Sequence, residues 1–328
     1  MESYQETERR LSQIPDLSIF RDRLLSRYTR FGIGGPADLY LETANEASFI
    51  EALRTARESG RDYVVIGGGT NLIVSDAGLR GIVLRFTANT IRNMETTVEA
   101  YAGAELQAVV DYTVERGLKG LETMTGIPGS LGAAVYGNAG AYGHSIMERV
   151  AQVRFFDGNA IRVFGNAECE FHYRESIFKR HKDWIIFSTE LRMEHAATAE
   201  LQDISSGILT VRNQKYPPSM KCAGSIFKNL ILSELPEDVR TRVPERVVRE
   251  GKVPSAWFLE QVDAKGMRNG GIRVADYHAN LIYNEGGGNA GELKQVIDEL
   301  KTRVQERFGL RLEEEVQYVG FNGTDSTR

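Results

Sequence analysis

Two glycine-rich segments have the residue types that bind phosphate groups through the backbone. They are VVIGGGTN at residues 64–71 and TGIPGSLGAAVYGNAGAYG at residues 125–143. Because glycine has no Cβ, main-chain N–H groups in such turns can reach a pyrophosphate without a positively charged side chain. Ser130, Asn138 and Tyr142 add hydroxyl and amide groups for a polar ligand. Tight loops with close packing explain the same glycines, so these segments alone leave both interpretations open.

Three further segments place polar side chains in apolar surroundings. The residues are Tyr173, Arg174 and Ser176 in FHYRESIFK, Ser225, Lys228 and Asn229 in AGSIFKN, and Glu313, Glu314 and Glu315 in LEEEVQYVG. If the last segment is a strand, Glu313 and Glu315 share a face opposite Glu314. Considered separately, each segment is equally well explained by a surface ion pair or a turn.

Several common chemistries lack their sequence patterns. GIGGPA at residues 32–37 loosely fits the dinucleotide-binding pattern, but no apolar strand precedes it and the alternating ADLYLE predicts a strand after it. A P-loop and a G-x-S-x-G nucleophile motif are absent. The five histidines do not stand at metal-ligand spacings with Cys169 or Cys222, so we expect no metal site.

Composition indicates an ordinary globular protein. The chain has 328 residues, a formal net charge of −5, 41% hydrophobic and 26% charged residues, enough for about two domains. The negative charge argues against nucleic-acid binding. The N-terminus lacks the apolar core of a signal peptide, and no apolar run approaches the roughly 18 residues that span a bilayer. Two isolated cysteines fit a reducing compartment, so we expect a cytoplasmic protein without membrane insertion.

Hydrophobic periodicity predicts the elements that position these segments in an α+β architecture. Helices are expected over residues 45–59 with Asn45 as N-cap, over 104–116, and over 290–308 before Gly309. Strands are expected at 64–66, 72–74, 152–164 as a hairpin around Asp157-Gly158, 184–193 and 272–283, with a last strand containing Leu312, Val316 and Tyr318. Pro217-Pro218 marks a break between a glycine-rich part and a smaller C-terminal part.

Seven motifs in this order give the chain a resemblance to the UDP-N-acetylenolpyruvoylglucosamine reductase family. They are RFGIGGPADLYLE, VVIGGGTNLIVSDAGLRGIVL, GLETMTGIPGSLGAAVYGNAGAYG, YRESIFK, AGSIFKN, HANLIYNEG and FGLRLEEEVQYVG. The resemblance extends over roughly residues 28–320, nearly the whole chain. The interval from Arg174 to Ser225 is short, as in the subclass that lacks a tyrosine-bearing loop insertion.

The resemblance implies an FAD-binding module of the vanillyl-alcohol-oxidase (PCMH) type. Its two α+β subdomains would be residues 1–90 and 91–205, and residues 206–328 would form a smaller α+β substrate-binding domain. The chain is expected to be a monomer that holds FAD non-covalently. The implied FAD contacts are Gly67, Gly68, Gly69, Thr70, Asn71, Gly126, Pro128, Gly129, Ser130, Gly132, Asn138, Ala139 and Gly140.

The family reaction has two halves. NADPH delivers a hydride to FAD, and the enolpyruvyl group of UDP-N-acetylglucosamine enolpyruvate is then reduced to the lactyl ether of UDP-N-acetylmuramate, a precursor of peptidoglycan. By resemblance, Arg174 steadies the substrate carboxylate, Ser225 protonates carbon 2, and Glu315 shares the developing charge if burial raises its pKa. Glu313 and Glu314 are second choices for Glu315, because a run of three leaves the register open. Positions that resemble those holding the UDP-sugar are Tyr173, Lys215, Asn229 and His278.

Two competing interpretations remain. An FAD-dependent oxidase or dehydrogenase of a sugar or alcohol would share the fold but lack the Arg174, Ser225 and Glu315 motifs. A non-enzymatic flavin- or nucleotide-sugar-binding protein would keep the glycines and lose at least one of those three residues. The sequence also departs from the family pattern, since Leu230 follows Asn229 where proline is frequent and the segment 230–255 is longer and more charged.

Overall fold

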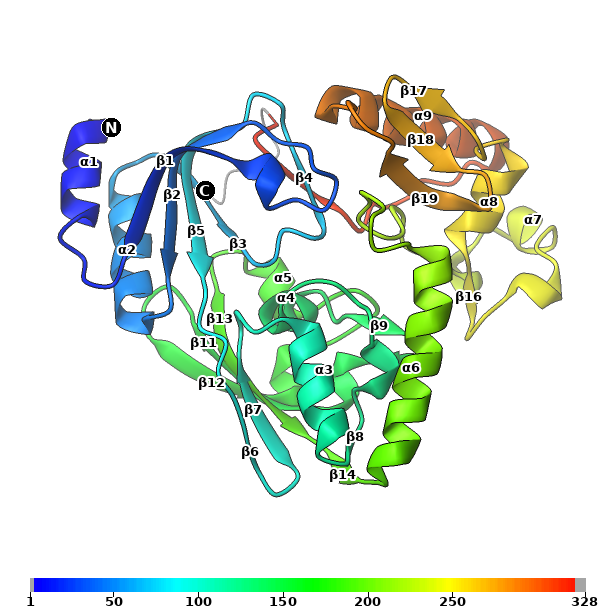
Figure 1. The fold of residues 1–328 in the computed structure, drawn as a ribbon. Helices are drawn as coiled ribbons and strands as arrows, with labels where there is room; N and C mark the ends of the chain where they lie inside the picture. The colour runs from blue at the N-terminus through cyan, green and yellow to red at the C-terminus, as the bar shows by residue number, and fades with distance from the viewer. Residues whose placement is uncertain (1–2, 322–328) are drawn as a thin grey trace.

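The computed structural model describes residues 3–321, whose elements form three lobes (Figure 1). The first lobe contains a four-stranded sheet in the order β1-β2-β5-β3. Strand β1 is antiparallel to β2, whereas β2, β5 and β3 are parallel to one another. The elements are β1 (Ser18–Leu24), β2 (Pro36–Thr43), α2 (Glu46–Glu58), β3 (Asp62–Ile66) and β5 (Leu79–Phe86).

The second lobe contains a five-stranded antiparallel sheet in the order β12-β11-β13-β7-β6. Its main elements are β6 (Ile91–Met94), β7 (Thr97–Tyr101), α3 (Leu106–Glu115), α4 (Leu131–Tyr136), β11 (Val150–Phe156), β12 (Ile161–Gly165), β13 (Ile185–Arg192) and α6 (Thr198–Lys215). The hairpin predicted around Asp157-Gly158 is present, and the Asp157 carboxylate accepts from the amides of Asn159 and Ala160. The third lobe contains β17 (Arg268–Asn269), β18 (Ile272–Ala275) and β19 (His278–Asn284) with α8 (Ser255–Gln261) and α9 (Ala290–Phe308).

Short elements complete the described chain. The helices are α1 (Tyr4–Leu11), α5 (Ile177–Arg180) and α7 (Glu237–Arg240), and the strands are β4 (Leu72–Val74), β8 (Leu118–Lys119), β9 (Gly140–Ala141), β10 (His144–Ser145), β14 (Glu194–His195), β15 (Leu230–Ile231), β16 (Lys252–Val253) and β20 (Gln317–Val319). The 3-10 turns are Leu25–Arg27, Glu122–Met124, Ile146–Glu148, Asn166–Cys169, Leu232–Glu234 and Glu245–Val247. No helix within residues 3–321 combines the length and apolar character that crossing a bilayer requires.

Local capping signals correctly located two of the long helices. The Asn45 side chain accepts from the Ser48 amide at the start of α2. Helix α9 begins with a capping box between Asn289 and Glu292, and it ends at Gly309, whose φ of 66° is the left-handed conformation that glycine adopts without strain. Both helices bury the apolar face that the 3.6-residue period predicted.

Helix α6 was not predicted, because its sequence has almost no amphipathic pattern. Of its 18 residues only Leu201 is buried, and Ile204, Leu209 and Val211 are at least 36% exposed. Pro217-Pro218 follow its end, as a proline stop should. The helix spans residue 205, where we divided the chain, so the division into 1–90, 91–205 and 206–328 stays a prediction.

The C-terminal segment returns to the first lobe. Strand β20 pairs in parallel with β4, which lies immediately after the first glycine-rich loop. The predicted longer strand starting at Leu312 is wrong, since Leu312 and Val316 are buried in the core of the third lobe but lie before the strand begins. The hydrophobic core of that lobe also includes Phe31 and Ile73 from the first, so packing joins the two lobes.

Hydrogen bonds to the Asp76 side chain also join the first and third lobes. Its carboxylate accepts from the amide of Ala290 at 2.9 and 3.0 Å and from that of Gly291 at 3.3 Å. These amides belong to the first turn of α9, where they have no partner within the helix. A negative charge at a helix N-terminus is also favoured by the helix dipole. Asp76 therefore serves as a second cap from 214 residues away.

Asp76→Ala should lower the free energy of unfolding by about 1 kcal/mol, the usual cost of losing a cap. Urea denaturation followed by circular dichroism measures this change. Asp203→Ala, on the exposed face of α6, is the matched control and should have little effect. Equal stability of Asp76→Ala and wild type would show that Asn289 alone caps α9 sufficiently.

Candidate active site

Arg174 and Glu315, 141 residues apart, form an ion pair where the lobes meet. The Arg174 Nε lies 3.3 and 3.2 Å from the two carboxylate oxygens of Glu315. The Arg174 terminal nitrogens donate to the carbonyl of Asn138 at 3.4 Å and to that of Gly140 at 2.9 Å. A guanidinium has five N–H groups, so one remains on each terminal nitrogen for a further acceptor.

Ser225 lies next to this pair through backbone contacts. The Glu315 amide donates to the Ile226 carbonyl at 2.8 Å, and the Lys228 amide donates to the Glu313 carbonyl at 2.9 Å. On its other side, Ser225 pairs with Leu281 of β19. Two hydrogen-bonded neighbours therefore fix the main chain of the half-buried Ser225. The structure thus brings together the three segments that the sequence proposed for catalysis.

Arg174 has a strained backbone. Its φ of 58° lies in the left-handed region, which costs a residue with a Cβ on the order of 1 kcal/mol or more. Such a conformation persists only where neighbouring groups hold it. Here the Lys179 Nζ donates to the Arg174 carbonyl at 3.0 Å, and four acceptor contacts hold the guanidinium.

Glu315 is the glutamate of the run that faces Arg174. Glu313 binds Lys228, Glu314 binds Lys301 of α9, and Glu315 binds Arg174. Burial raises the pKa of Glu315 above its ordinary value of 4.5, and the opposing charges of Arg174, Lys179 and Lys228 do not cancel the effect. A protonated carboxyl at this position is the state that charge sharing with a substrate would need.

The two glycine-rich loops pack against each other. The Thr70 hydroxyl donates to the Pro128 carbonyl at 3.2 Å, and a Cβ on Gly68 would lie 3.2 Å from the Gly129 Cα. Gly69 has a φ of 67°, and a Cβ there would lie 1.9 Å from the Tyr28 carbonyl oxygen. Close packing therefore explains why these positions are glycine, as one of the two sequence interpretations proposed.

The amides of the first loop favour the other interpretation as well. None of the amides from Gly68 to Asn71 has an acceptor within residues 3–321, although Gly69 is buried. Buried amides without partners are costly, and consecutive ones form an anion site. The loop therefore fits the pyrophosphate of a dinucleotide such as FAD. It joins two strands, so no helix N-terminus contributes there.

Three polar side chains expected to contact the ligand also shape the loops. The Asn71 side chain donates to the Glu315 carbonyl at 2.8 Å, and Ser130 caps α4 by accepting from Ala133. The Asn138 side chain donates to the His172 carbonyl at 2.7 Å. Main-chain amides of the first loop therefore remain for a cofactor, together with the Ser130 hydroxyl hydrogen and the Asn71 side-chain oxygen.

The four positions expected to hold the UDP-sugar form two groups. The Asn229 amide donates to the Tyr173 hydroxyl at 3.3 Å, next to Arg174. Lys215 and His278 form the other group: burial, followed by the charge of Lys215, lowers the His278 pKa to about 4. His278 is therefore neutral at pH 7, and its buried Nδ1 has no hydrogen-bond partner among the described residues.

One residue near the site was missed by sequence reasoning. The Nζ of Lys252 in β16 lies 5.1 Å from the centre of the Tyr173 ring. This lysine belongs to the segment 230–255, which stood out only as unusually charged. The pairing of β16 with β15 places Lys252 opposite Ile231, two residues after Asn229, and no local pattern reveals this pairing.

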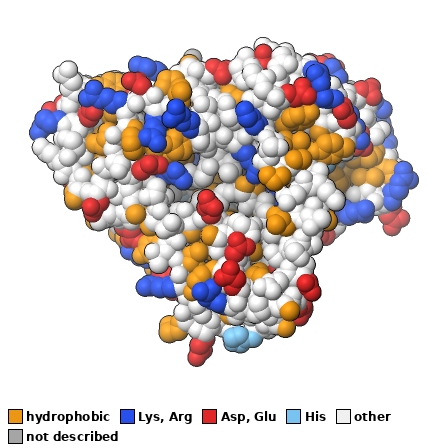
Figure 2. Space-filling model, viewed as in Figure 1, with side chains coloured by type: hydrophobic (Ala, Val, Ile, Leu, Met, Phe, Trp, Pro, Cys, Tyr) orange, Lys and Arg blue, Asp and Glu red, His pale blue; other side chains and the backbone are white. Residues whose placement is uncertain are grey.

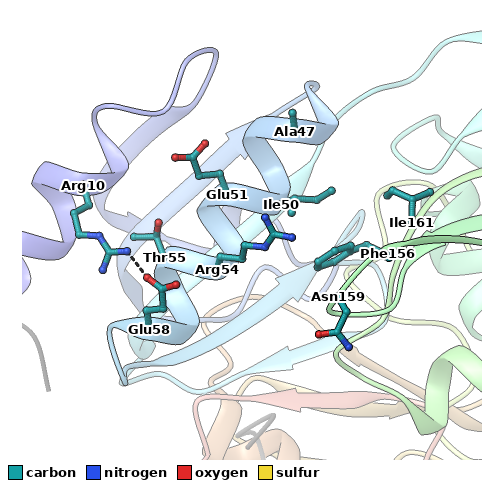
Figure 3. A pocket seen from close by; sticks show the side chains of 11 residues that line it. Arg10, Ala47, Ile50, Glu51, Arg54, Thr55, Glu58, Phe156, Asn159 and Ile161 are labelled. Carbon is teal, nitrogen blue, oxygen red and sulfur yellow. Dashed lines mark hydrogen bonds and ion pairs between the residues drawn. The ribbon is translucent and has the colours of Figure 1, made fainter.

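A cleft of about 600 Å³ lies away from all these residues, between α2 and the β11-β12 hairpin (Figure 3). Ile50, Phe156 and Ile161 contribute apolar surface, and Arg10 pairs with Glu58 at one side. Figure 2 shows that Lys and Arg side chains are interspersed with Asp and Glu over the face it displays. No group of three or more His, Cys, Asp or Glu side chains in residues 3–321 is arranged to hold a metal ion.

Comparison with known families defines the class of protein first. The FAD binding domain family matches residues 37–163, which contain both glycine-rich loops. The family described as UDP-N-acetylenolpyruvoylglucosamine reductase, C-terminal domain, matches residues 216–319. The chain is thus a flavoprotein with an FAD-binding module followed by a reductase-type domain, and the predicted α+β fold of the vanillyl-alcohol-oxidase type is confirmed.

Individual relatives define the family. UDP-N-acetylenolpyruvoylglucosamine reductase of Solibacter usitatus (strain Ellin6076) is 66% identical over 311 residues, covering 95% of this chain and 100% of that protein. The reductase of Rubrobacter xylanophilus is 36% identical, covering 91% and 94%. The crystal structure of the Thermus caldophilus reductase aligns with a TM-score of 0.72 at 27% identity, covering 92% and 99%. The chain therefore belongs to the UDP-N-acetylenolpyruvoylglucosamine reductase family.

The stability of Glu315→Gln relative to wild type should increase as the pH rises from about 4 to about 8. A carboxyl with a raised pKa contributes stability that is fully present below its unfolded-state pKa and is lost as the pH rises through the folded-state value. Glutamine cannot ionise and avoids this loss. Urea unfolding of both proteins across the range measures the difference. A difference that stays constant or decreases would contradict the raised pKa.

Proposed function

We propose that this protein is an NADPH-dependent flavoenzyme that reduces UDP-N-acetylglucosamine enolpyruvate to UDP-N-acetylmuramate in peptidoglycan synthesis. The observation that carries the proposal is the Arg174–Glu315 contact beside the Ser225 backbone. That contact joins Arg174, which follows the FAD-binding match over residues 37–163, to Glu315 within the reductase-type match over residues 216–319. The identity of 66% to a reductase of this name supports the same reaction.

FAD, bound non-covalently, would supply the hydride that it receives from NADPH. The residues that would hold it are those of loop 67–71, together with residues 126–132 and 138–140. The unpartnered amides of the first loop suit its pyrophosphate. Neither loop contains a histidine or cysteine that could form a covalent bond to a flavin.

Arg174 would bind the substrate carboxylate. When a hydride adds to carbon 3 of the enolpyruvyl group, negative charge develops on carbon 2 and spreads into that carboxylate. The two N–H groups that Arg174 has left can donate hydrogen bonds, as a fork, to the carboxylate oxygens that carry this charge. The protein contacts to Nε and to the terminal nitrogens hold the guanidinium in place beforehand, so it need not reorganise during the reaction.

Ser225 would give a proton to carbon 2. A hydroxyl is a weak acid, which suffices here because the carbanion-like centre is a strong base. Burial raises the pKa of Glu315, so its protonated form, which would share charge with the same centre, is favoured by its surroundings. The hydrogen bond from the Glu315 amide to the Ile226 carbonyl joins the two main-chain segments that carry these groups.

Tyr173, Asn229, Lys215 and His278 would bind the UDP-sugar. Lys215 supplies a positive charge for the diphosphate, and the neutral imidazole of His278 can donate one hydrogen bond without adding a second charge. The protein would act as a monomer in the cytoplasm, where its substrate and NADPH occur. Its two buried, unpaired cysteines support a reducing compartment.

The competing interpretations are less well supported. An oxidase or dehydrogenase of sugars or alcohols would not be expected to have an arginine–glutamate pair whose glutamate comes from a reductase-type domain. A non-enzymatic binding protein would not need the strained conformation of Arg174. The absorbance of the purified protein, together with bleaching by NADPH and turnover of the enolpyruvyl UDP-sugar, tests all three interpretations.

Ser225→Ala should leave flavin reduction by NADPH nearly unchanged and slow reoxidation by the enolpyruvyl UDP-sugar about 10²–10⁴-fold, the scale of a lost proton donor. Stopped-flow absorbance separates the two half-reactions. Ser206→Ala, on the exposed face of α6, is the control and should slow neither. If Ser225→Ala slows both half-reactions equally, Ser225 is not the proton donor.

Arg174→Lys should also impair reoxidation by the substrate while sparing reduction by NADPH. A lysine keeps the charge but offers a compact ammonium in place of the planar fork, and it loses the hydrogen bonds to Asn138 and Gly140. The same stopped-flow assay measures the effect. Normal reoxidation in this variant would show that charge alone suffices and would remove the two-pronged contact from the mechanism.

A further inference from the structure

Lys228 is a buried lysine bound by two carboxylates. Only 8% of the residue is exposed. Its Nζ donates to Glu175 at 2.7 Å and also to Glu313. Glu175 accepts in addition from the Nζ of Lys179 at 2.8 Å. These four side chains, which we call the Lys228 network, carry two positive and two negative charges, so the charge of the buried Lys228 is compensated.

Lys228 and its two carboxylate partners each lie close in sequence to a different residue of the proposed catalytic set. Glu175 follows Arg174 directly, Glu313 lies two positions before Glu315, and Lys228 itself lies three positions after Ser225. Lys179 closes the network by donating to the Arg174 carbonyl at 3.0 Å. One ammonium group therefore ties together three segments that are far apart in the sequence.

The network meets the two mechanical demands of this site. Arg174 needs an external restraint, because its φ of 58° is unfavourable for any residue with a Cβ. The Ser225 and Glu315 segments need a fixed register, and the Lys228 side chain adds a bond to the backbone bond that its amide makes to Glu313. Burial alone would lower the pKa of Lys228, but the hydrogen bonds that its Nζ donates to Glu175 and Glu313 outweigh this effect and raise the pKa.

We infer that Lys228 is a positioning residue that holds Arg174, Ser225 and Glu315 in the relative placement required for catalysis. This inference rests on the proposed function, because it assigns a purpose to the placement of those three groups. Lys228 acts through Glu175 and Glu313 and does not contact the substrate. Its burial and its two carboxylate partners leave it poorly placed to meet a ligand.

Lys228→Met tests the inference in the full-length protein purified with its FAD. We expect kcat to fall about 10²-fold, since misplacing a catalytic group by about 1 Å costs that much. The affinity for UDP, measured by calorimetry, should change less than about 3-fold, because UDP has no carboxylate for Arg174 to bind and Lys215 and His278 are untouched. A double-mutant cycle with Glu175→Gln should be strongly non-additive, since both changes break the same contact.

Lys301→Met is the matched control. Lys301 pairs with Glu314, the middle glutamate of the same run, but touches no catalytic residue. Its kcat should equal that of wild type. If Lys228→Met does not fold, Glu313→Gln replaces it, because the Glu313 side chain is 70% exposed and its loss removes only one acceptor. That variant should lower kcat at least about 3-fold, the effect of a looser site.

Three results would overturn the inference. One is a kcat for Lys228→Met, or for its replacement Glu313→Gln, equal to that of Lys301→Met. Another is a parallel loss of UDP affinity and kcat, which would make Lys228 a ligand-binding residue. The third is additivity with Glu175→Gln. An inactive wild-type protein would instead refute the proposed function, so the two failures are distinguishable.

Discussion

The site depends on one short segment of backbone that pairs with two lobes at once. The amide of Glu315 donates to Ile226 in the C-terminal part of the chain, while its carbonyl accepts from the Asn71 side chain in the first glycine-rich loop. Two residues later, Gln317 begins the strand that pairs with β4. The position of the carboxyl relative to Arg174 is therefore set by hydrogen bonds on both sides, and a shift of either lobe would move it.

Electrostatics follow from this arrangement. Closing the three segments around one point buries several charges, and each is compensated by a specific partner rather than by solvent. Arg174 faces Glu315, and Lys228 faces two acids. Glu315 is the group for which burial prevails over its cationic neighbours. Burial therefore raises the pKa of a carboxyl that lies beside a guanidinium, a direction that suits a reaction generating negative charge.

Local sequence signals predicted much of the fold but only part of the site. Asn45, Asp157-Gly158 and Gly309 marked a helix start, a hairpin and a helix end, because capping and turn preferences act over a few residues. Helix α6 was not predicted because it buries only one apolar residue and its sequence lacks the 3.6-residue hydrophobic period. The motifs identified Arg174, Ser225 and Glu315, and with them the family.

What the sequence could not reveal arises from contacts between distant segments. The left-handed backbone conformation of Arg174 is imposed by its surroundings, so the residue type does not predict it. The partners of Lys228 and the approach of Lys252 to Tyr173 likewise depend on how the lobes meet. The loop glycines were open to two interpretations, and the structure supports both, since the Cβ positions meet protein atoms while the amides lack acceptors.

The segment that pairs with both lobes lies late in the sequence, and this position has a consequence for biosynthesis. Residues 313–319 emerge from the ribosome after every strand and helix that they connect. The FAD-binding part can therefore fold around its large apolar core while translation continues, but Arg174 has no carboxylate partner until Glu315 has been made. The Arg174–Glu315 pair can therefore form only after Glu315 has been made, so an interrupted polypeptide ending before Glu315 lacks this pair.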